Sequence, residues 1–262
     1  MALTAEGKRL TEKHRREQIA VGARAEIQAR LLWPSLRVGD LDRSEAAWMP
    51  MMLAVTEGAY SESAALATTY VDGYRQAEIG RPAAPVSPGF DRTAHMSALH
   101  LAGPVRVKLL IEGGMSPDAA HAQAFTKFAG IVRRQTLLGG RATVNATARV
   151  DRRAIGWRRV TDGDPCAFCA MLASRGPVYS SRGGAEVVAG SGLRYHGHCG
   201  CTGEIVYDEW VPNEAEARYI EAYEQAAAEA EAAGYSRTQD SVLWRMRRDG
   251  GFRDSPRTTT PG

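Results

Sequence analysis

Long hydrophobic runs are missing from this chain of 262 residues. No stretch of about 18 apolar residues occurs, so we expect neither a membrane-spanning helix nor a membrane partner. Residues 1–16 are polar and charged, whereas a secretory signal contains an apolar central segment. We therefore expect the protein to stay in a reducing cytoplasm, where clustered cysteines favour a metal site over disulfides.

A strong excess of charge of one sign is missing as well. The 33 Lys and Arg residues nearly balance the 30 Asp and Glu residues, and the net charge of +3 does not by itself indicate a nucleic-acid partner. In contrast, 44% of the residues are hydrophobic, which is enough for a sizeable buried core. The composition indicates a globular protein of one large or two ordinary domains, and no motif indicates a small-molecule substrate.

The first part of the chain has the periodicity of α-helices. Residues 4–32 carry one apolar stripe that we expect to face the core, formed by Ala20, Ala23, Ile27 and Leu31. Residues 44–79 carry a second stripe at helical spacing, which includes Trp48, Met52, Tyr70 and Tyr74. Three prolines within residues 80–89 then predict a linker or an ordered crossover, because proline removes backbone donors.

A helical region with a basic face is predicted at residues 93–156. We expect a break at Gly103-Pro104, a helix that ends at Gly139 and Gly140, and a further helical piece at 143–155. Eight arginines but only one acid occur between residues 133 and 159. Five of them are candidates for contact with DNA phosphates or an acidic protein surface: Arg149, Arg152, Arg153, Arg158 and Arg159. The alternative is that these arginines pair with acids elsewhere, such as those in 204–231.

All four cysteines lie in one module at residues 157–210. Cys166 and Cys169 follow Asp164-Pro165, which predicts a helix start that places both sulfurs on one side of the helix. Cys199 and Cys201 precede an alternating segment and point to the same face of an extended chain. Two close pairs of soft ligands predict a shared tetrahedral zinc site, with His196 as a substitute ligand or hydrogen-bonding partner.

These segments predict a mainly α fold with a small α+β, zinc-stapled module. An extended helical N-terminal region (1–80) precedes the linker (81–92), the helical region (93–156), the module (157–210), C-terminal helices (211–250) and a disordered tail (251–262). The strands of the module are expected near 157–160 and 202–207, and a short helix near 185–189. Asn213 and Glu216 predict a capping box at the start of the first C-terminal helix.

The catalytic motifs that could accompany such a cluster are incomplete. A zinc deaminase needs an upstream H-x-E, and no histidine before residue 166 is followed two positions later by glutamate. A redox role of C-x-x-C lacks the βαβ pattern, and the neighbouring histidines disfavour an iron–sulfur cluster. Ser180 and Ser181 lack a protease constellation. A nuclease that uses His196 or His198 as the base remains an alternative, although we do not expect an enzyme.

The cysteine module resembles the MuF-like minor head proteins of tailed bacteriophages, also called head morphogenesis proteins. The resemblance rests on the segment 161–172 with its C-x-x-C motif, and on Tyr195-His-Gly-His-Cys-Gly-Cys201 before a strand. In that family the second segment is typically H-P-x-C-R-C. Here Gly197 and Gly200 stand in place of the usual proline and arginine, so an anion-binding role at position 200 is in doubt.

The resemblance implies a structural virion component that acts in procapsid assembly. It implies a place in the phage head interior or at the portal vertex after synthesis in the bacterial cytoplasm. The portal and capsid proteins, and packaged DNA, would be its partners. Some related phage proteins are capsid maturation proteases, so a maturation protease or a metal-dependent hydrolase (nuclease) is the alternative function.

Overall fold

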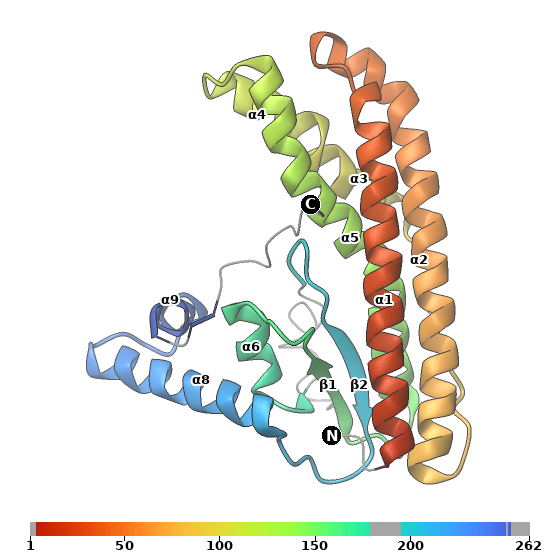
Figure 1. Cartoon of the computed structure of the whole chain (residues 1–262), viewed down its shortest axis with the longest axis vertical. Helices are drawn as coiled ribbons and strands as arrows, with labels where there is room; N and C mark the ends of the chain where they lie inside the picture. Colours follow the sequence, from red (N-terminus) through yellow and green to blue (C-terminus); the bar gives the residue numbers. More distant parts are fainter. Residues whose placement is uncertain (1–3, 179–194, 250, 253–262) are drawn as a thin grey trace.

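Three long helices form the body of the protein in the computed structural model, which describes residues 4–178, 195–249 and 251–252. The helices α1 (Ala5–Leu32), α2 (Leu41–Ile79) and α5 (Pro117–Val150) pack along one another, as Figure 1 shows. Two short 3₁₀ turns, Trp33–Ser35 and Val38–Asp40, connect α1 to α2. The helices α3 (Arg92–Ala102) and α4 (Pro104–Glu112) pack against α5 and α2. The expected mainly helical fold is confirmed.

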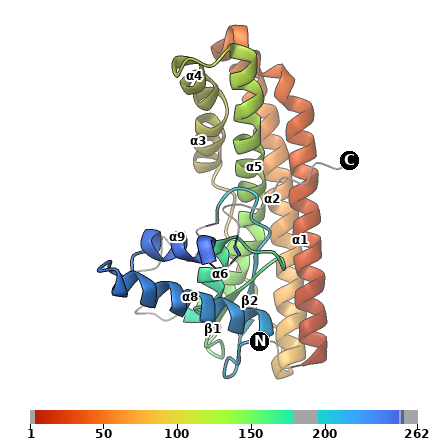
Figure 2. The same cartoon turned by 60° about the vertical axis from the view of Figure 1, so that its left-hand side comes forward.

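A smaller body lies against the lower half of these helices (Figures 1 and 2). Its strands β1 (Gly156–Val160) and β2 (Thr202–Val206) pair antiparallel, and β2 contacts α5 and α1. The short helix α6 (Ala167–Ala173) packs on β1, while α8 (Glu214–Ala232) and α9 (Gln239–Asp249) extend away from the bundle. The capping box that starts α8 is present as predicted.

No helix in the described part of the chain has the length and apolar character needed to cross a membrane.

The predicted apolar stripe of the first helix is wrong. Ile27 and Leu31 are 58% and 75% exposed, and the buried face of α1 instead carries small and polar residues. These buried residues include Thr11, His14, Gln18, Gly22, Ala25 and Ala29. Small side chains let α2 and α5 approach closely, and the polar ones find partners there: the Gln18 side chain donates to the Ser63 carbonyl and accepts from the Ser63 hydroxyl, at 2.9 and 2.6 Å.

The predicted helix end at Gly139 and Gly140 is also wrong, because α5 continues through both glycines to Val150. A Cβ atom at Gly139 would overlap the backbone of Tyr60 in α2. A Cβ atom at Gly140 would lie 2.8 Å from the Gln18 side chain in α1. These glycines therefore serve close helix packing and not helix termination. Of the predicted separate helix at 143–155, residues 143–150 are the last part of α5 and residues 151–155 are not helical.

Two smaller expectations have different outcomes. The break at Gly103-Pro104 is confirmed, since α3 ends at Ala102 and α4 begins at Pro104. The short helix of the module begins later than predicted, because Cys166 and not Asp164 is its N-cap residue. The predicted helix at 185–189, the two serines at 180 and 181, and all but the first two residues of the predicted tail lie outside the described residues.

Two hydrophobic clusters divide the core. The upper cluster contains residues from each of the helices α1, α2, α3, α4 and α5, and it includes Trp33, Trp48 and Phe128. The lower cluster joins the bundle to the module and includes Tyr70, Tyr74, Trp157, Met171 and Ile205. Because the lower cluster holds β1, β2 and α6 against α2 and α5, it fixes the position of the four cysteines.

Candidate metal centre

The fold brings together all four cysteines and His196. Cys166 and Cys169 come from the start of α6, whereas Cys199 and Cys201 lie just before β2. The Sγ atoms of Cys169 and Cys199 are 3.5 Å apart. His196 Nε2 lies 2.8 Å from the Sγ of Cys166 and 3.4 Å from that of Cys169. All four thiols are free and almost completely buried, so the site is closed to bulk water on the sulfur side.

The five ligand atoms form two overlapping groups that share Cys169. One group contains Cys166, Cys169 and His196, and the other contains Cys169, Cys199 and Cys201. Within each group the ligand atoms lie within 4.8 Å of one another. Tetrahedral zinc with Zn–S bonds of about 2.3 Å places its sulfur ligands about 3.8 Å apart. The distance of 3.5 Å between the sulfurs of Cys169 and Cys199 is close to this value, so these side chains could hold a metal ion.

His196 is oriented as histidine ligands of metals usually are. Its Nδ1 donates to the carbonyl oxygen of Gly197 at 2.6 Å, which directs Nε2 toward the sulfurs. Burial alone would lower the pKa of His196, but the hydrogen bond with Cys166 and the charges of Cys199 and Cys166 raise it to about 9. The charge of the imidazole is therefore stabilised by the neighbouring sulfurs.

The surroundings favour the thiolate form of two cysteines. A hydrogen bond from Cys169 lowers the pKa of Cys166 to about 5, against the effect of burial and with help from His196. Burial opposes ionisation of Cys199, yet hydrogen bonds from Cys169 and Cys201 and the charges of nearby arginines hold its pKa well below the usual value. Thiolates are the form of cysteine that binds metal.

Two buried arginines lie beside the sulfurs. Arg141 of α5 donates from Nη2 to the Cys199 carbonyl at 2.7 Å and from Nε to the Cys201 carbonyl at 3.1 Å. Its guanidinium carbon and that of Arg159 stand 3.6 and 3.9 Å from the ring centre of Tyr195. Neither Arg141 nor Tyr195 was predicted as a residue of the site. The high arginine content of 133–159 was the one available signal, and it does not distinguish a buried arginine from an exposed one.

The second histidine of the motif contacts the bundle. His198 adopts a left-handed backbone conformation with φ of 61°, which is uncommon for a residue with a side chain. Its Nε2 donates to the Thr126 carbonyl at 2.9 Å, and its Nδ1 lies 3.5 Å from a carboxylate oxygen of Glu26. The imidazole ring of His198 packs against Gly130 of α5, where a Cβ atom would lie only 2.7 Å from the ring. His198 therefore attaches the cysteine loop to α5 and α1, and its ring is occupied there.

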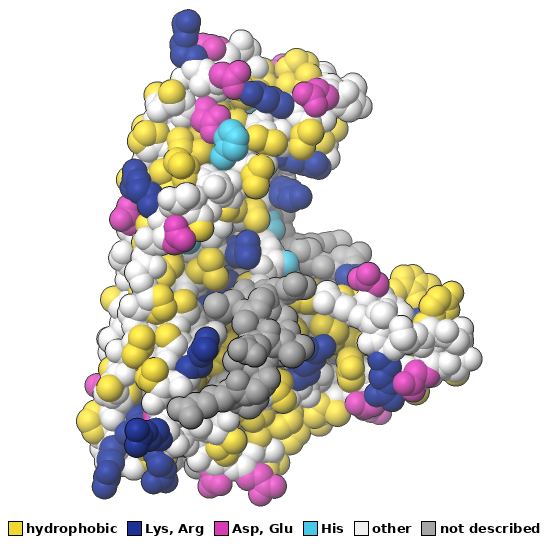
Figure 3. All heavy atoms as spheres, turned by 180° about the vertical axis from the view of Figure 1, so that it is seen from behind, with side chains coloured by type: hydrophobic (Ala, Val, Ile, Leu, Met, Phe, Trp, Pro, Cys, Tyr) yellow, Lys and Arg dark blue, Asp and Glu magenta, His cyan; other side chains and the backbone are white. Residues whose placement is uncertain are grey.

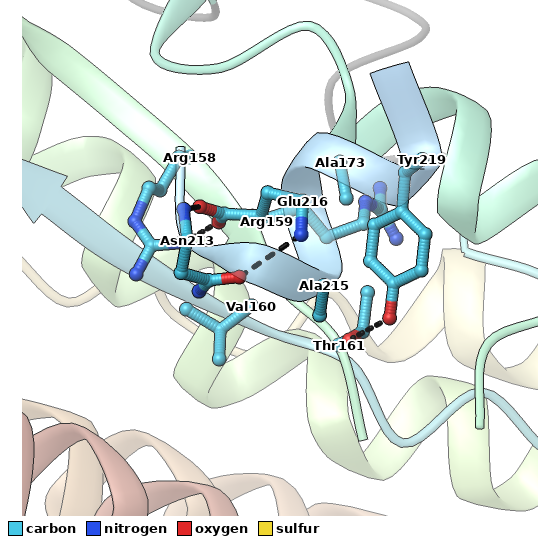
Figure 4. Close-up of a pocket in the computed structure, with 9 residues that line it drawn as sticks. All are labelled: Arg158, Arg159, Val160, Thr161, Ala173, Asn213, Ala215, Glu216 and Tyr219. Atoms are coloured by element: carbon cyan, nitrogen blue, oxygen red, sulfur yellow. Dashed lines mark hydrogen bonds and ion pairs between the residues drawn. The ribbon is translucent and has the colours of Figure 1, made fainter. Parts of the chain in front are cut away.

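The predicted basic residues separate into two sets, and the first set is buried. Arg158 Nε donates to Glu204 at 2.7 Å, and its Nη1 donates to Glu216 of α8. Figure 4 shows Arg158, Glu216 and Arg159 beside a cavity of about 120 Å³. Thr11 of α1 also donates to Glu204, at 2.8 Å. Arg158 and Arg159 are 5% and 1% exposed, so neither can reach a DNA phosphate in this structure.

The second set, Arg149, Arg152 and Arg153, is exposed at the end of α5 and in the turn that follows. Among the described residues, Arg158 pairs with acids of 204–231 as expected, whereas Arg149, Arg152 and Arg153 form no ion pair with them.

The family model described as VG15 protein, a phage protein family, matches residues 7–230, which include most of the bundle, both strands, all four cysteines and His196. No curated protein and no solved structure matches the chain.

Proposed function

Because the chain belongs to the VG15 family of phage proteins, we propose that it is a structural minor capsid protein that acts in head morphogenesis near the portal vertex. The observation that carries the proposal is the closed sulfur cluster, built from a C-x-x-C helix start and a second pair at a strand entrance. This order along the chain is the feature that resembles MuF-like head proteins. The portal and capsid proteins of the same phage are the proposed partners.

We propose zinc as the metal, held by Cys166, Cys169, Cys199 and Cys201, with His196 hydrogen-bonded beside them. Zinc with four thiolates carries a charge of about −2, which buried Arg141 and Arg159 would neutralise. A closed set of four sulfur ligands is typical of structural zinc. Zinc would supply a cross-link between the start of α6 and the entrance of β2.

The residues around the cluster extend that cross-link to the bundle. Arg141 holds the carbonyl groups of Cys199 and Cys201 against α5. His198 holds the same loop against Thr126 and Glu26. The proposed role is therefore mechanical: the module and the long helices move as one body when the protein binds in the head.

Metal content tests the proposed site. We expect about one zinc per chain in protein purified without added metal, measured by inductively coupled plasma mass spectrometry. Cys169→Ser should lose the metal, because Cys169 belongs to both ligand groups. His196→Ala should retain it if the four cysteines are the ligands, and loss of zinc in this variant would instead make His196 a ligand. Zinc-free wild-type protein would contradict the zinc proposal.

Particle assembly tests the proposed function. The full chain is produced with the portal and major capsid proteins of the same phage, and procapsids are isolated and analysed by mass spectrometry. Wild-type protein should be found in the particles, and Cys169→Ser should be depleted. Arg218→Ser, an exposed substitution on α8, is the matched control and should be incorporated normally. Absence of the wild-type protein from particles would contradict the minor capsid role.

A further inference from the structure

A basic surface lies at the end of the molecule where α2 and α5 end, away from the cysteine cluster. Figure 3 shows a group of basic side chains at this end, at the lower left of the view. The exposed arginines at or just beyond the ends of α2 and α5 are Arg81, Arg149, Arg152 and Arg153. Within the described part of the chain, none of these four side chains has an ion-pair partner.

A cavity of about 290 Å³ opens at this surface. Arg152 and Arg153 line it together with Arg75, Thr147 and Asp151. Arg149 and Arg81 each directly neighbour a lining residue in sequence, Val150 and Pro82. Arg152 and Arg153 therefore border a concave site that is large enough for a phosphate group and is open to solvent, and Arg81 and Arg149 lie next to its lining in sequence.

The acid in this cavity is already neutralised. Asp151 accepts from Arg75 Nε at 2.6 Å and from the Tyr207 hydroxyl at 3.1 Å. It also accepts from the backbone N–H of Arg153 at 3.0 Å, which fixes the turn that carries Arg152 and Arg153. Asp72 of α2 accepts from the backbone N–H of Ala83 at 2.9 Å. The four exposed arginines therefore keep their positive charge for an external anion.

We propose that this surface, defined by Arg81, Arg149, Arg152 and Arg153, binds the phosphodiester backbone of nucleic acid without sequence preference. Arginine offers a planar fork of donors that matches phosphate oxygens, and the site contains no lysine. Binding to phosphates positions a protein on the duplex but does not read the bases. The inference does not depend on the proposed zinc site, because none of these arginines contacts the sulfur cluster.

Binding of the full chain to DNA tests the proposal. Fluorescence anisotropy with two unrelated 30-base-pair duplexes should give equal affinities for both. The logarithm of the binding constant should fall linearly with the logarithm of salt concentration, with a slope of about −0.9 for each phosphate contact. Arg152→Gln with Arg153→Gln should weaken binding about tenfold at low salt and reduce the slope by about 2.

The control variant removes the same charge elsewhere. Lys127→Gln with Arg218→Gln replaces two exposed basic residues on α5 and α8 and should leave affinity and slope nearly unchanged. Equal losses in both double variants would mean that only net charge matters and would overturn the proposal. Thermal melts should show that both variants fold like the wild type, because all four side chains are exposed.

A competition experiment distinguishes nucleic acid from an acidic protein partner. Unlabelled duplex should displace the labelled duplex, whereas poly-L-glutamate at the same charge concentration should displace it poorly. If poly-L-glutamate binds equally well and loses affinity in the Arg152/Arg153 variant, the surface recognises acidic protein and the proposal is wrong. The zinc content of the Arg152/Arg153 variant should equal that of the wild type. A loss of DNA binding in this variant is then not caused by a loss of zinc.

Discussion

The bundle spreads its buried contacts along three helices of 28, 39 and 34 residues, whereas the cysteine module gathers its contacts around one point. In the bundle, glycine, alanine and hydrogen-bonded polar side chains let the helices approach closely. In the module, two five-residue strands and a seven-residue helix surround the sulfur cluster. A single substitution should therefore matter little in most of the bundle and greatly in the cluster.

Removal of the proposed zinc should separate the two regions most clearly. A strong chelator, or Cys169→Ser, should reduce hydrogen-exchange protection of β1, β2 and α6 by about 100-fold or more, because such small metal domains depend on the ion for folding. Protection in α3 and the upper half of α2 should change little. Ser174→Ala, at the end of α6 but outside the cluster, is the matched control. An equal loss of protection throughout the chain would show that the two regions form one cooperative unit.

The next largest effect is expected where a buried charge joins both regions. Arg158 of β1 pairs with Glu204 of β2 and Glu216 of α8, and Glu204 also accepts from Thr11 of α1. Arg158→Met should lower the free energy of unfolding by about 3–5 kcal/mol, because two carboxylates stay buried without their cation. Urea denaturation followed by circular dichroism measures the change.

Two further variants test this explanation for Arg158. Adding Glu204→Gln and Glu216→Gln to Arg158→Met should recover much of the stability, since the uncompensated charges are then gone. Arg9→Ala, which breaks an exposed pair with Glu6, should have no measurable effect. If Arg158→Met is as harmless as Arg9→Ala, the buried network contributes nothing to the join between module and bundle.

Within the bundle, two glycines should respond in opposite directions. Gly139→Ala should lower the free energy of unfolding by about 1–3 kcal/mol, because the new methyl group meets the backbone of Tyr60. Gly58 lies in α2 with open space where its Cβ would stand. Gly58→Ala should therefore raise stability by about 0.5–1 kcal/mol through its better helix propensity. Thermal denaturation of both variants measures these changes. Equal effects of the two substitutions on stability would contradict this explanation.

The sequence predicted the structural features that depend on neighbouring residues. The helices, the break at Gly103-Pro104, the two strands and the capping box at Asn213 each depend on residues a few positions apart. The sequence also predicted which side chains approach one another at the cluster, because sulfur ligands occur nowhere else in the chain.

Contacts between distant segments were not predictable in the same way. The polar buried face of α1 contradicts the apolar stripe predicted for this helix. Gln18 and Thr11 can be buried because they form hydrogen bonds with Ser63 and Glu204, which are distant in sequence. Gly139 looks like a helix end until Tyr60 is placed beside it. Likewise Arg158 and Arg152 each begin an Arg-Arg pair in the sequence, and only the fold makes one buried and the other exposed.

An effect that depends on pH is expected at Asp151, where the end of the bundle meets the module. Burial opposes its charge, but hydrogen bonds from Arg75, Arg153 and Tyr207 hold the pKa of Asp151 below its usual value. A carboxylate with a depressed pKa stabilises the fold above its unfolded pKa of about 3.9, and this contribution is lost as the pH falls through the lower folded value. Asp151→Asn should therefore cost about 1 kcal/mol at pH 7.

The pH dependence distinguishes this charge effect from a simple loss of packing. The difference in melting temperature between the wild type and Asp151→Asn should shrink as the pH falls below about 4, because the carboxylate is protonated first in the unfolded chain and only at lower pH in the folded protein. Glu221→Gln, an exposed change on α8, is the control and should follow the wild type at every pH. A difference that stays constant with pH would show that shape, and not charge, holds Tyr207 of the module against Arg75 of the bundle.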